Sequence, residues 1–144
     1  MKNFLDEEGD FTYLQPSEYT ILKEYKKQKK TGLIFIRYQK KNSELKGVRP
    51  NTEHLSRVHK QPNRIYSTEG THPTIPSTEI SGRYWIYDNG KVRKLTINEC
   101  YRFFGFPENF KKVESKSDLY KRIGNSVCVN MVQEIGKELR KQFF

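Results

Sequence analysis

The clearest candidates for a nucleophile in this chain are its two cysteines, Cys100 and Cys128. A catalytic thiolate needs a neighbouring cation, base or helix N-terminus that lowers the pKa of its thiol. Cys100 follows Glu99 on the apolar face of a predicted helix, and Cys128 follows Val127 at the start of another. We therefore interpret both as small core residues. They have no paired spacing and form no metal-ligand pattern with the three histidines, which argues against a disulfide and a zinc site.

A second feature with chemical potential is the tripeptide Gly124-Asn125-Ser126, which precedes a predicted helix. The first backbone N–H groups of a helix have no partner within it, and they can bind polar or anionic groups of a ligand. A compact Gly-Asn turn at this point could form such a site. The alternative is an ordinary helix cap.

The net charge of the chain favours a polyanionic partner. The 144 residues carry a formal charge of +10, and the resulting positive potential attracts nucleic acid. Charge alone leaves open a soluble domain that is basic for no functional reason. The chain has no run of 18 apolar residues and no apolar core of a signal peptide, so we expect a cytoplasmic protein without membrane association.

The elements that must position these residues begin with a predicted short helix. In the segment 17–30, Tyr19, Leu22 and Tyr25 could form one helical stripe, and Ser17 could cap it. Gly32 would interrupt this pattern. The sequence therefore predicts a helix at the start of the chain.

One strand and a long loop follow. Residues 33–36 form a brief apolar run typical of a strand. Residues 40–64 hold two prolines, seven Lys or Arg and few aliphatic side chains. Such a stretch buries little surface, so we expect a long basic loop that binds a partner or lacks order.

A hairpin and two helices are predicted in the second half. Asp88-Asn89-Gly90 separates strand-like residues 83–87 from a strand at 91–95, because Asn-Gly tolerates positive φ at both turn positions. Thr96-Ile97-Asn98-Glu99 has the spacing of a capping box, and Gly105 with Pro107 ends this helix. A second helix follows Ser126. Its predicted buried side consists of Val129, Val132, Ile135, Gly136 and Leu139.

Three segments resemble the DNA (cytosine-5) methyltransferase family. The stretches RKLTINECYRFFGFPENF at 93–110 and YKRIGNSVCVNMV at 120–132 look like its last two conserved motifs. The stretch QPNRIYSTEGTHPTI at 61–75 resembles the end of its target recognition domain. Three motifs in the family's order identify the chain as the C-terminal part of such an enzyme, in a bacterial restriction-modification type system.

The resemblance implies contacts to double-stranded DNA. Arg64 matches a position that faces the major groove, where an arginine can read guanine through two hydrogen bonds, although a phosphate contact remains the alternative. Gln61 matches a position that can enter the gap left by the flipped base. Thr74 matches a position that anchors the recognition domain and contacts the phosphate backbone. In the basic loop, Lys40, Lys41 and Lys46 are predicted phosphate contacts.

The resemblance also implies a site for S-adenosyl-L-methionine. Gly124, Asn125 and Ser126 match residues that border the methionine end of this cofactor, and the helix after them packs beside the cofactor-binding strand. The segment 93–107 is interpreted as scaffold, in which Arg93 and Arg102 pair with acidic groups or carbonyls and Glu99 completes the cap.

The implied fold is α+β. Residues 1–92 would form a small, irregular, mostly β target recognition domain. Residues 93–144 would form helices that pack on a catalytic Rossmann-like domain not present in this chain. Such helices would leave an apolar face without its partner.

The family's chemistry needs a Pro-Cys loop, a Glu-Asn-Val motif and a Gly-rich cofactor turn, and this chain contains none of them. The first hypothesis is one subunit of a split enzyme, inactive alone, whose partner polypeptide carries the N-terminal methyltransferase motifs; Met1 stands where the recognition region would begin. The second is a stand-alone or relic DNA-binding module. An RNA-associated protein would explain the charge but not the motifs.

Overall fold

The computed structural model describes residues 1–39, 64–77 and 84–143, and these fall into two compact units. The first consists of Met1–Pro73 and Arg83–Leu95, and the second of Thr74–Gly82 and Thr96–Phe144. The first unit holds the strands and the second holds the α-helices. The chain therefore has a mixed α+β fold.

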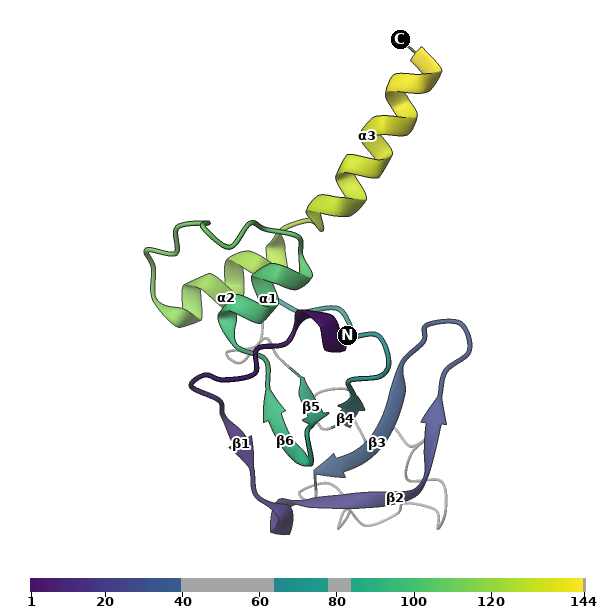
Figure 1. Cartoon of the computed structure of the whole chain (residues 1–144), viewed down its shortest axis with the longest axis vertical. Helices are drawn as coiled ribbons and strands as arrows, with labels where there is room; N and C mark the ends of the chain where they lie inside the picture. Colours follow the sequence, from purple (N-terminus) through teal and green to yellow (C-terminus); the bar gives the residue numbers. More distant parts are fainter. Residues whose placement is uncertain (40–63, 78–83, 144) are drawn as a thin grey trace. The chain divides into compact units, whose positions relative to one another are not determined.

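The first unit is built on a six-stranded sheet with the order β1-β6-β5-β4-β3-β2 (Figure 1). Neighbouring strands run antiparallel, except that β4 and β5 run parallel. A parallel pair cannot be joined by a tight turn, so the chain leaves the sheet after β4 and returns before β5. The strands are β1 Tyr13–Leu14, β2 Tyr19–Lys27, β3 Ile34–Gln39, β4 Arg64–Ser67, β5 Trp85–Asp88 and β6 Lys91–Lys94.

The helix predicted at 17–30 is wrong, because this segment forms the strand β2. Isolated short helices are marginal in water, and β2 instead pairs with β3 at both of its ends, with a register shift between Ile21 and Lys26. Tyr25 is 63% exposed, so the expected apolar stripe does not exist. Ser17 lies in the short 3-10 helix η2, Pro16–Glu18, rather than at a helix cap. Another 3-10 helix, η1, spans Lys2–Phe4.

The predicted hairpin is confirmed. Strands β5 and β6 pair in register from Trp85 with Lys94 to Asp88 with Lys91. Asn89 and Gly90 both have positive φ, 46° and 82°, as a two-residue hairpin turn requires. The apolar core on one side of the sheet contains Tyr19, Ile36, Ile65, Trp85 and Val92.

Helix α1, Ile97–Phe103, begins and ends where the sequence predicts. The side chain of Thr96 accepts a hydrogen bond from the backbone N–H of Glu99, and the Glu99 carboxylate accepts one from the N–H of Thr96. After the helix, Gly105 has a φ of +78°, the left-handed conformation that favours glycine.

Helix α2, Lys116–Asn125, is absent from the sequence-based prediction. It begins at the cap Ser115, whose hydroxyl accepts a hydrogen bond from the N–H of Asp118, and it buries Leu119, Tyr120 and Ile123. It lies beside α1 in the second unit (Figure 1).

Helix α3, Val129–Phe143, forms where the second helix was predicted, with Arg140 and Lys141 in its last turn. Its start is tied to the end of α1, because the N–H of Val129 donates to the carbonyl of Phe104 at 2.8 Å. The predicted buried side is not buried within this chain, since no residue of α3 is. No helix among the described residues has the length and apolar character needed to cross a membrane.

Candidate functional site

Arg64 is the first residue of β4 and is partly buried. Its guanidinium carbon lies 4.9 Å from the centroid of the Phe35 ring, a cation–π distance that restrains the side chain. Phe35 in turn packs on Tyr66, with ring centroids 5.1 Å apart. The Arg64 side chain therefore packs against a buried aromatic cluster, and Arg64 itself belongs to a strand rather than to a loop.

His72 is a structural residue of the segment after β4. Burial lowers the pKa of its imidazole to about 4, so the ring is neutral at neutral pH. Its Nδ1 lies 2.6 Å from the carbonyl oxygen of Pro73, and the ring packs on Tyr84 at 5.8 Å between centroids. Through these contacts His72 and Pro73 shape the loop after β4.

Thr74 is exposed and belongs to the second unit, whereas Arg64 belongs to the first. The residue after it, Ile75, is only 3% exposed. Thr74 is thus an exposed residue whose position in the chain is held by the burial of the next residue, Ile75. Four other predicted DNA contacts lie outside the described residues: Lys40, Lys41, Lys46 and Gln61.

The tripeptide Gly124-Asn125-Ser126 stands at the end of α2 rather than at the start of a helix, although α3 follows from Val129 as predicted. Gly124 and Asn125 are the last residues of α2, and Ser126 is its C-cap. Both the N–H and the hydroxyl of Ser126 donate to the carbonyl of Ile123, at 3.1 and 2.8 Å. Asn125 is exposed. Carbonyl groups, not N–H groups, therefore dominate the electrostatics at this turn.

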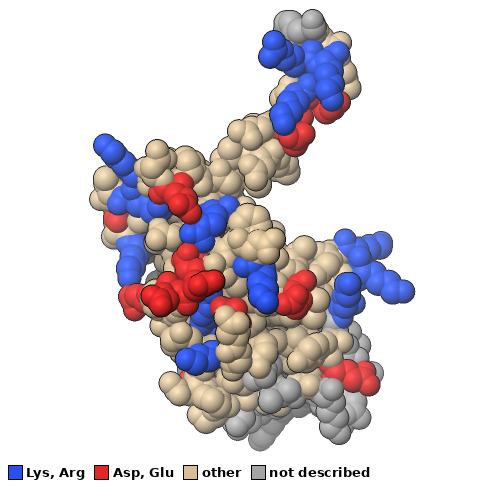
Figure 2. Space-filling view, in the orientation of Figure 1, with Lys and Arg blue, Asp and Glu red and all other residues tan. Residues whose placement is uncertain are grey.

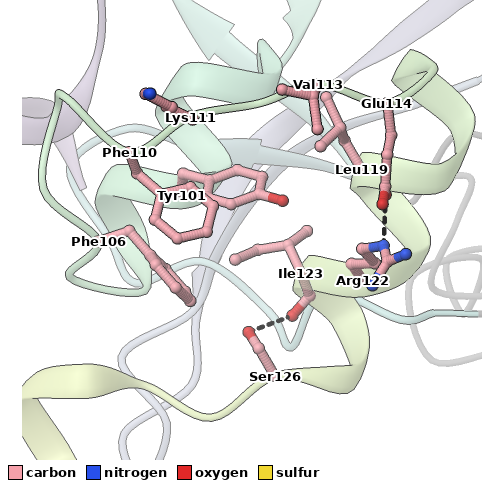
Figure 3. Close-up of a pocket in the computed structure, with 10 residues that line it drawn as sticks. All are labelled: Tyr101, Phe106, Phe110, Lys111, Val113, Glu114, Leu119, Arg122, Ile123 and Ser126. Atoms are coloured by element: carbon pink, nitrogen blue, oxygen red, sulfur yellow. Dashed lines mark hydrogen bonds and ion pairs between the residues drawn. The ribbon is translucent and has the colours of Figure 1, made fainter.

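A pocket of about 220 Å³ opens beside this turn in the second unit (Figure 3). Its floor is aromatic: the ring centroids of Tyr101, Phe106 and Phe110 lie 5.0 to 5.5 Å apart. Figure 3 shows an ion pair between Arg122 and Glu114 on one side of the pocket. Val113, Leu119, Ile123, Lys111 and Ser126 complete the lining.

Burial raises the pKa of the Tyr101 hydroxyl above its ordinary value, and the nearby Glu114 carboxylate raises it further. The phenol is therefore neutral at neutral pH and can donate a hydrogen bond. Sequence reasoning missed this pocket. The spacing of aromatic residues in FFGFPENF, at 103–110, was the available sign of it.

A family model described as C-5 cytosine-specific DNA methylase matches residues 2–141, which is nearly the whole chain. The chain belongs to this family. The methylase chain is 40% identical over 101 residues to the type II methyltransferase M.HhaI of Haemophilus parahaemolyticus, covering 65% of this chain and 30% of that protein. It is 37% identical over 75 residues to the type II methyltransferase M.NgoPII of Neisseria gonorrhoeae, covering 49% and 22%. The methylase chain thus spans less than a third of these relatives.

Neither of the two cysteines of this chain, Cys100 and Cys128, forms a disulfide. Cys100 is completely buried in α1, as a core residue should be, whereas Cys128 is only partly buried. Neither follows a proline. Among residues 1–39, 64–77 and 84–143, no three His, Cys, Asp or Glu side chains are grouped so that they could hold a metal ion.

The scaffold interpretation of the segment that begins at Arg93 has direct support in the methylase chain. The Arg93 guanidinium forms an ion pair with Asp88 at 2.9 Å and also donates to the carbonyl of Lys94. Arg102 lies 3.6 Å from Glu108. Phe106 packs edge-on against Tyr101, so the segment after α1 seats an aromatic ring.

Proposed function

We propose that this chain is the DNA-recognition and C-terminal portion of a DNA cytosine-5 methyltransferase of a restriction-modification type system. It positions double-stranded DNA and completes the S-adenosyl-L-methionine site, while a partner polypeptide carries the catalytic cysteine. Residues 1–92 serve recognition, and residues 93–144 return to the catalytic domain. Membership of the C-5 cytosine-specific DNA methylase family supports the reaction class.

In this proposal Arg64 reads the DNA. A guanidinium can donate two hydrogen bonds to O6 and N7 of guanine, which discriminates against other bases by about 1–3 kcal/mol. The Phe35 ring beneath it reduces the side-chain entropy that such a contact costs. Gln61 enters the gap left by the flipped cytosine, and Thr74 with Lys40, Lys41 and Lys46 contacts phosphates.

The turn at the end of α2 fits one part of the cofactor. Partial negative charge gathers at a helix C-terminus, so the turn suits the ammonium and sulfonium groups rather than the carboxylate. The exposed amide of Asn125 can accept or donate hydrogen bonds there, and Gly124 and Ser126 shape the turn. When bound, S-adenosyl-L-methionine supplies the methyl group. This chain contributes one wall of that site.

Cytosine-5 methylation also requires a thiolate that attacks carbon 6 and an acid near N3 of a flipped base. Cys100 cannot reach a substrate, because its side chain is fully buried. We therefore place the thiolate, the acid and the Gly-rich cofactor turn on the partner polypeptide.

The observation that supports a partner polypeptide is the exposed apolar stripe of α3. Its side chains lie within one arc of the helix and are 47% to 69% exposed. Figure 2 shows charged residues towards the C-terminal end of α3 and tan surface near its start. Apolar surface of this kind is typical of an interface. The stripe consists of Met131, Val132, Ile135, Leu139 and Phe143.

The test is complementation. The partner is a polypeptide with the family's N-terminal motifs, encoded beside this chain or taken from M.HhaI. Tritiated methyl transfer to duplex DNA is measured for each piece and for the mixture. We expect activity in the mixture alone. No activity in the mixture, together with salt-dependent duplex binding by this chain, would favour the stand-alone or relic binding module instead.

Two sets of variants sharpen this test. Ile135→Glu with Leu139→Glu should abolish complementation, whereas Lys137→Glu, which changes the net charge by the same amount on the charged side of α3, should not. A chain with Cys100→Ser and Cys128→Ser should stay active in the mixture. Loss of activity in the folded double serine variant would show that the nucleophile had been misplaced.

A further inference from the structure

Gly124 makes the closest backbone approach of any described glycine. A Cβ built on it would lie 2.6 Å from the backbone nitrogen of Ser77 and 2.7 Å from the carbonyl carbon of Pro76. Cβ atoms in proteins almost never come within 3.0 Å of another group. The atoms in contact are backbone, so they cannot turn aside as a flexible side chain could. The segment Pro76-Ser77 therefore rests directly on α2.

Space, rather than backbone conformation, explains this glycine. Gly124 is not among the residues with positive φ, and it lies within a regular helix. Glycine destabilises such a position relative to alanine. Its presence is accounted for by the segment that crosses it. A Cβ added to Gly136 in α3, in contrast, would meet no atom within 4 Å.

The segment on Gly124 is the one that carries Thr74. Ile75 is buried, and residues 74–82 group with the helices rather than with the sheet. Two contacts hold this short stretch in place. The Ile75 side chain is buried in the core, and the backbone of Pro76-Ser77 packs against Gly124. The exposed Thr74 extends from a segment seated on α2.

We propose that Gly124 is a positioning residue for DNA binding: it seats Pro76-Ser77 on α2 and so fixes where Thr74 meets the phosphate backbone. This inference rests on the proposed function. It changes the role of Gly124 from a cofactor contact to a support for the DNA-contacting segment. It also makes that segment and the cofactor-side residues Asn125 and Ser126 parts of one packed piece.

The test compares Gly124→Ala with Gly136→Ala in the full chain. Both variants add one methyl group to a helical glycine, but only the first meets the backbone of another segment. At fixed salt, we expect Gly124→Ala to weaken duplex DNA binding by about threefold to tenfold, the equivalent of one lost hydrogen bond. Gly136→Ala should bind as the parent chain does.

Two readouts separate positioning from a general loss of stability. At a temperature where circular dichroism shows full folding, amide hydrogen exchange in Gly124→Ala should accelerate at Ile75 and Ser77 while α1 keeps its protection. In the complemented enzyme, the KM for duplex DNA should rise while kcat at saturating DNA stays within about twofold. If Gly124→Ala does not fold, Ile75→Val loosens the same segment more gently and should show the same pattern.

The outcomes are distinct. Affinity and exchange in Gly124→Ala equal to those in Gly136→Ala would overturn this inference and leave the proposed function intact. A parent chain that fails to bind duplex DNA would overturn both. A rise in the KM for S-adenosyl-L-methionine alone would return Gly124 to the cofactor site.

Discussion

Arg93 and Asp88 form an ion pair that is almost entirely withdrawn from water, with side chains 2% and 10% exposed. Two guanidinium nitrogens approach the same carboxylate oxygen, at 2.9 and 3.0 Å. The guanidinium also lies 4.1 Å from the centroid of the Phe11 ring. The pair therefore joins the β5–β6 hairpin to the N-terminal segment of the first unit.

Breaking this pair should destabilise the first unit strongly. Asp88→Ala leaves the Arg93 charge buried without its carboxylate, a change that costs about 3–5 kcal/mol in other proteins. Urea denaturation followed by circular dichroism measures it. The control is Glu108→Ala at the exposed Arg102–Glu108 pair, where we expect about 1 kcal/mol or less. Equal losses for the two variants would contradict a structural role for the buried pair.

Acid should destabilise the protein through His72. The folded state holds the pKa of His72 at about 4, below its ordinary value of 6.5. The unfolded chain therefore binds this proton first, and stability is lost as the pH falls from about 6.5 towards 4, by at most about 3 kcal/mol. Thermal melts across this range measure it. In His72→Gln the decline should be smaller, and an unchanged decline would assign it to other groups.

The basic loop should dominate the salt dependence of duplex binding. Replacing Lys40, Lys41 and Lys46 by Gln removes three predicted phosphate contacts, so the slope of log K against log salt should fall by up to about 2.7. Fluorescence anisotropy at several salt concentrations measures the slope. The control replaces the exposed Lys111, Lys116 and Lys121 by Gln, with the same change in charge. Equal slopes for the two triple variants would remove the loop from the interface.

Arg64→Ala should change sequence preference at one base pair. A contact to a guanine edge contributes about 1–3 kcal/mol for that base, so a library of duplex sites should lose discrimination at a single position. Arg64→Lys, which keeps the charge but not the fork of donors, should lose it too. Uniform weakening over all sequences would show a phosphate contact instead.

The cofactor assignment predicts a division between two affinities. The isolated chain should bind no S-adenosyl-L-methionine measurably by calorimetry, because it provides one wall of the site. In the complemented enzyme, Asn125→Ala should raise the KM for the cofactor more than the KM for DNA. Tight cofactor binding by the isolated chain would refute the assignment.

Local patterns predicted those elements that local contacts determine. The capping box at Thr96 and Glu99 closes within one helical turn, and Asn89-Gly90 sets its hairpin alone, so the sequence sufficed for both. Strand β2 depends on pairing with the next strand, β3, and no pattern within residues 17–30 reports that pairing, whereas the helical spacing of Tyr19, Leu22 and Tyr25 does lie within it. Ser115 and Asp118 showed the start of α2 just as Thr96 and Glu99 did for α1, but the polar loop before α2 concealed it.

The candidate site shows the same division. The residue pattern placed Asn125 and Ser126 at the start of a helix, whereas they end α2, because α2 was missing from the prediction. The contact between Gly124 and Ser77 joins segments 47 positions apart in the printed sequence. No periodicity in either segment reports such a contact, and only the folded chain reveals why a glycine stands there.

The interleaving of the two units affects how this protein can be recombined with its relatives. The chain passes between them at 73/74, at 82/83 and at 95/96. A single graft point near the start of α1 would transfer the helices without Pro76-Ser77, the segment that packs on Gly124 of α2. An exchange of the first unit between relatives must therefore cut the chain at all three crossings, or it must transfer Pro76-Ser77 together with the α2 surface around Gly124 on which that segment rests. The same constraint applies to evolution, because a new first unit cannot be acquired by a single fusion when the chain passes between the two units three times.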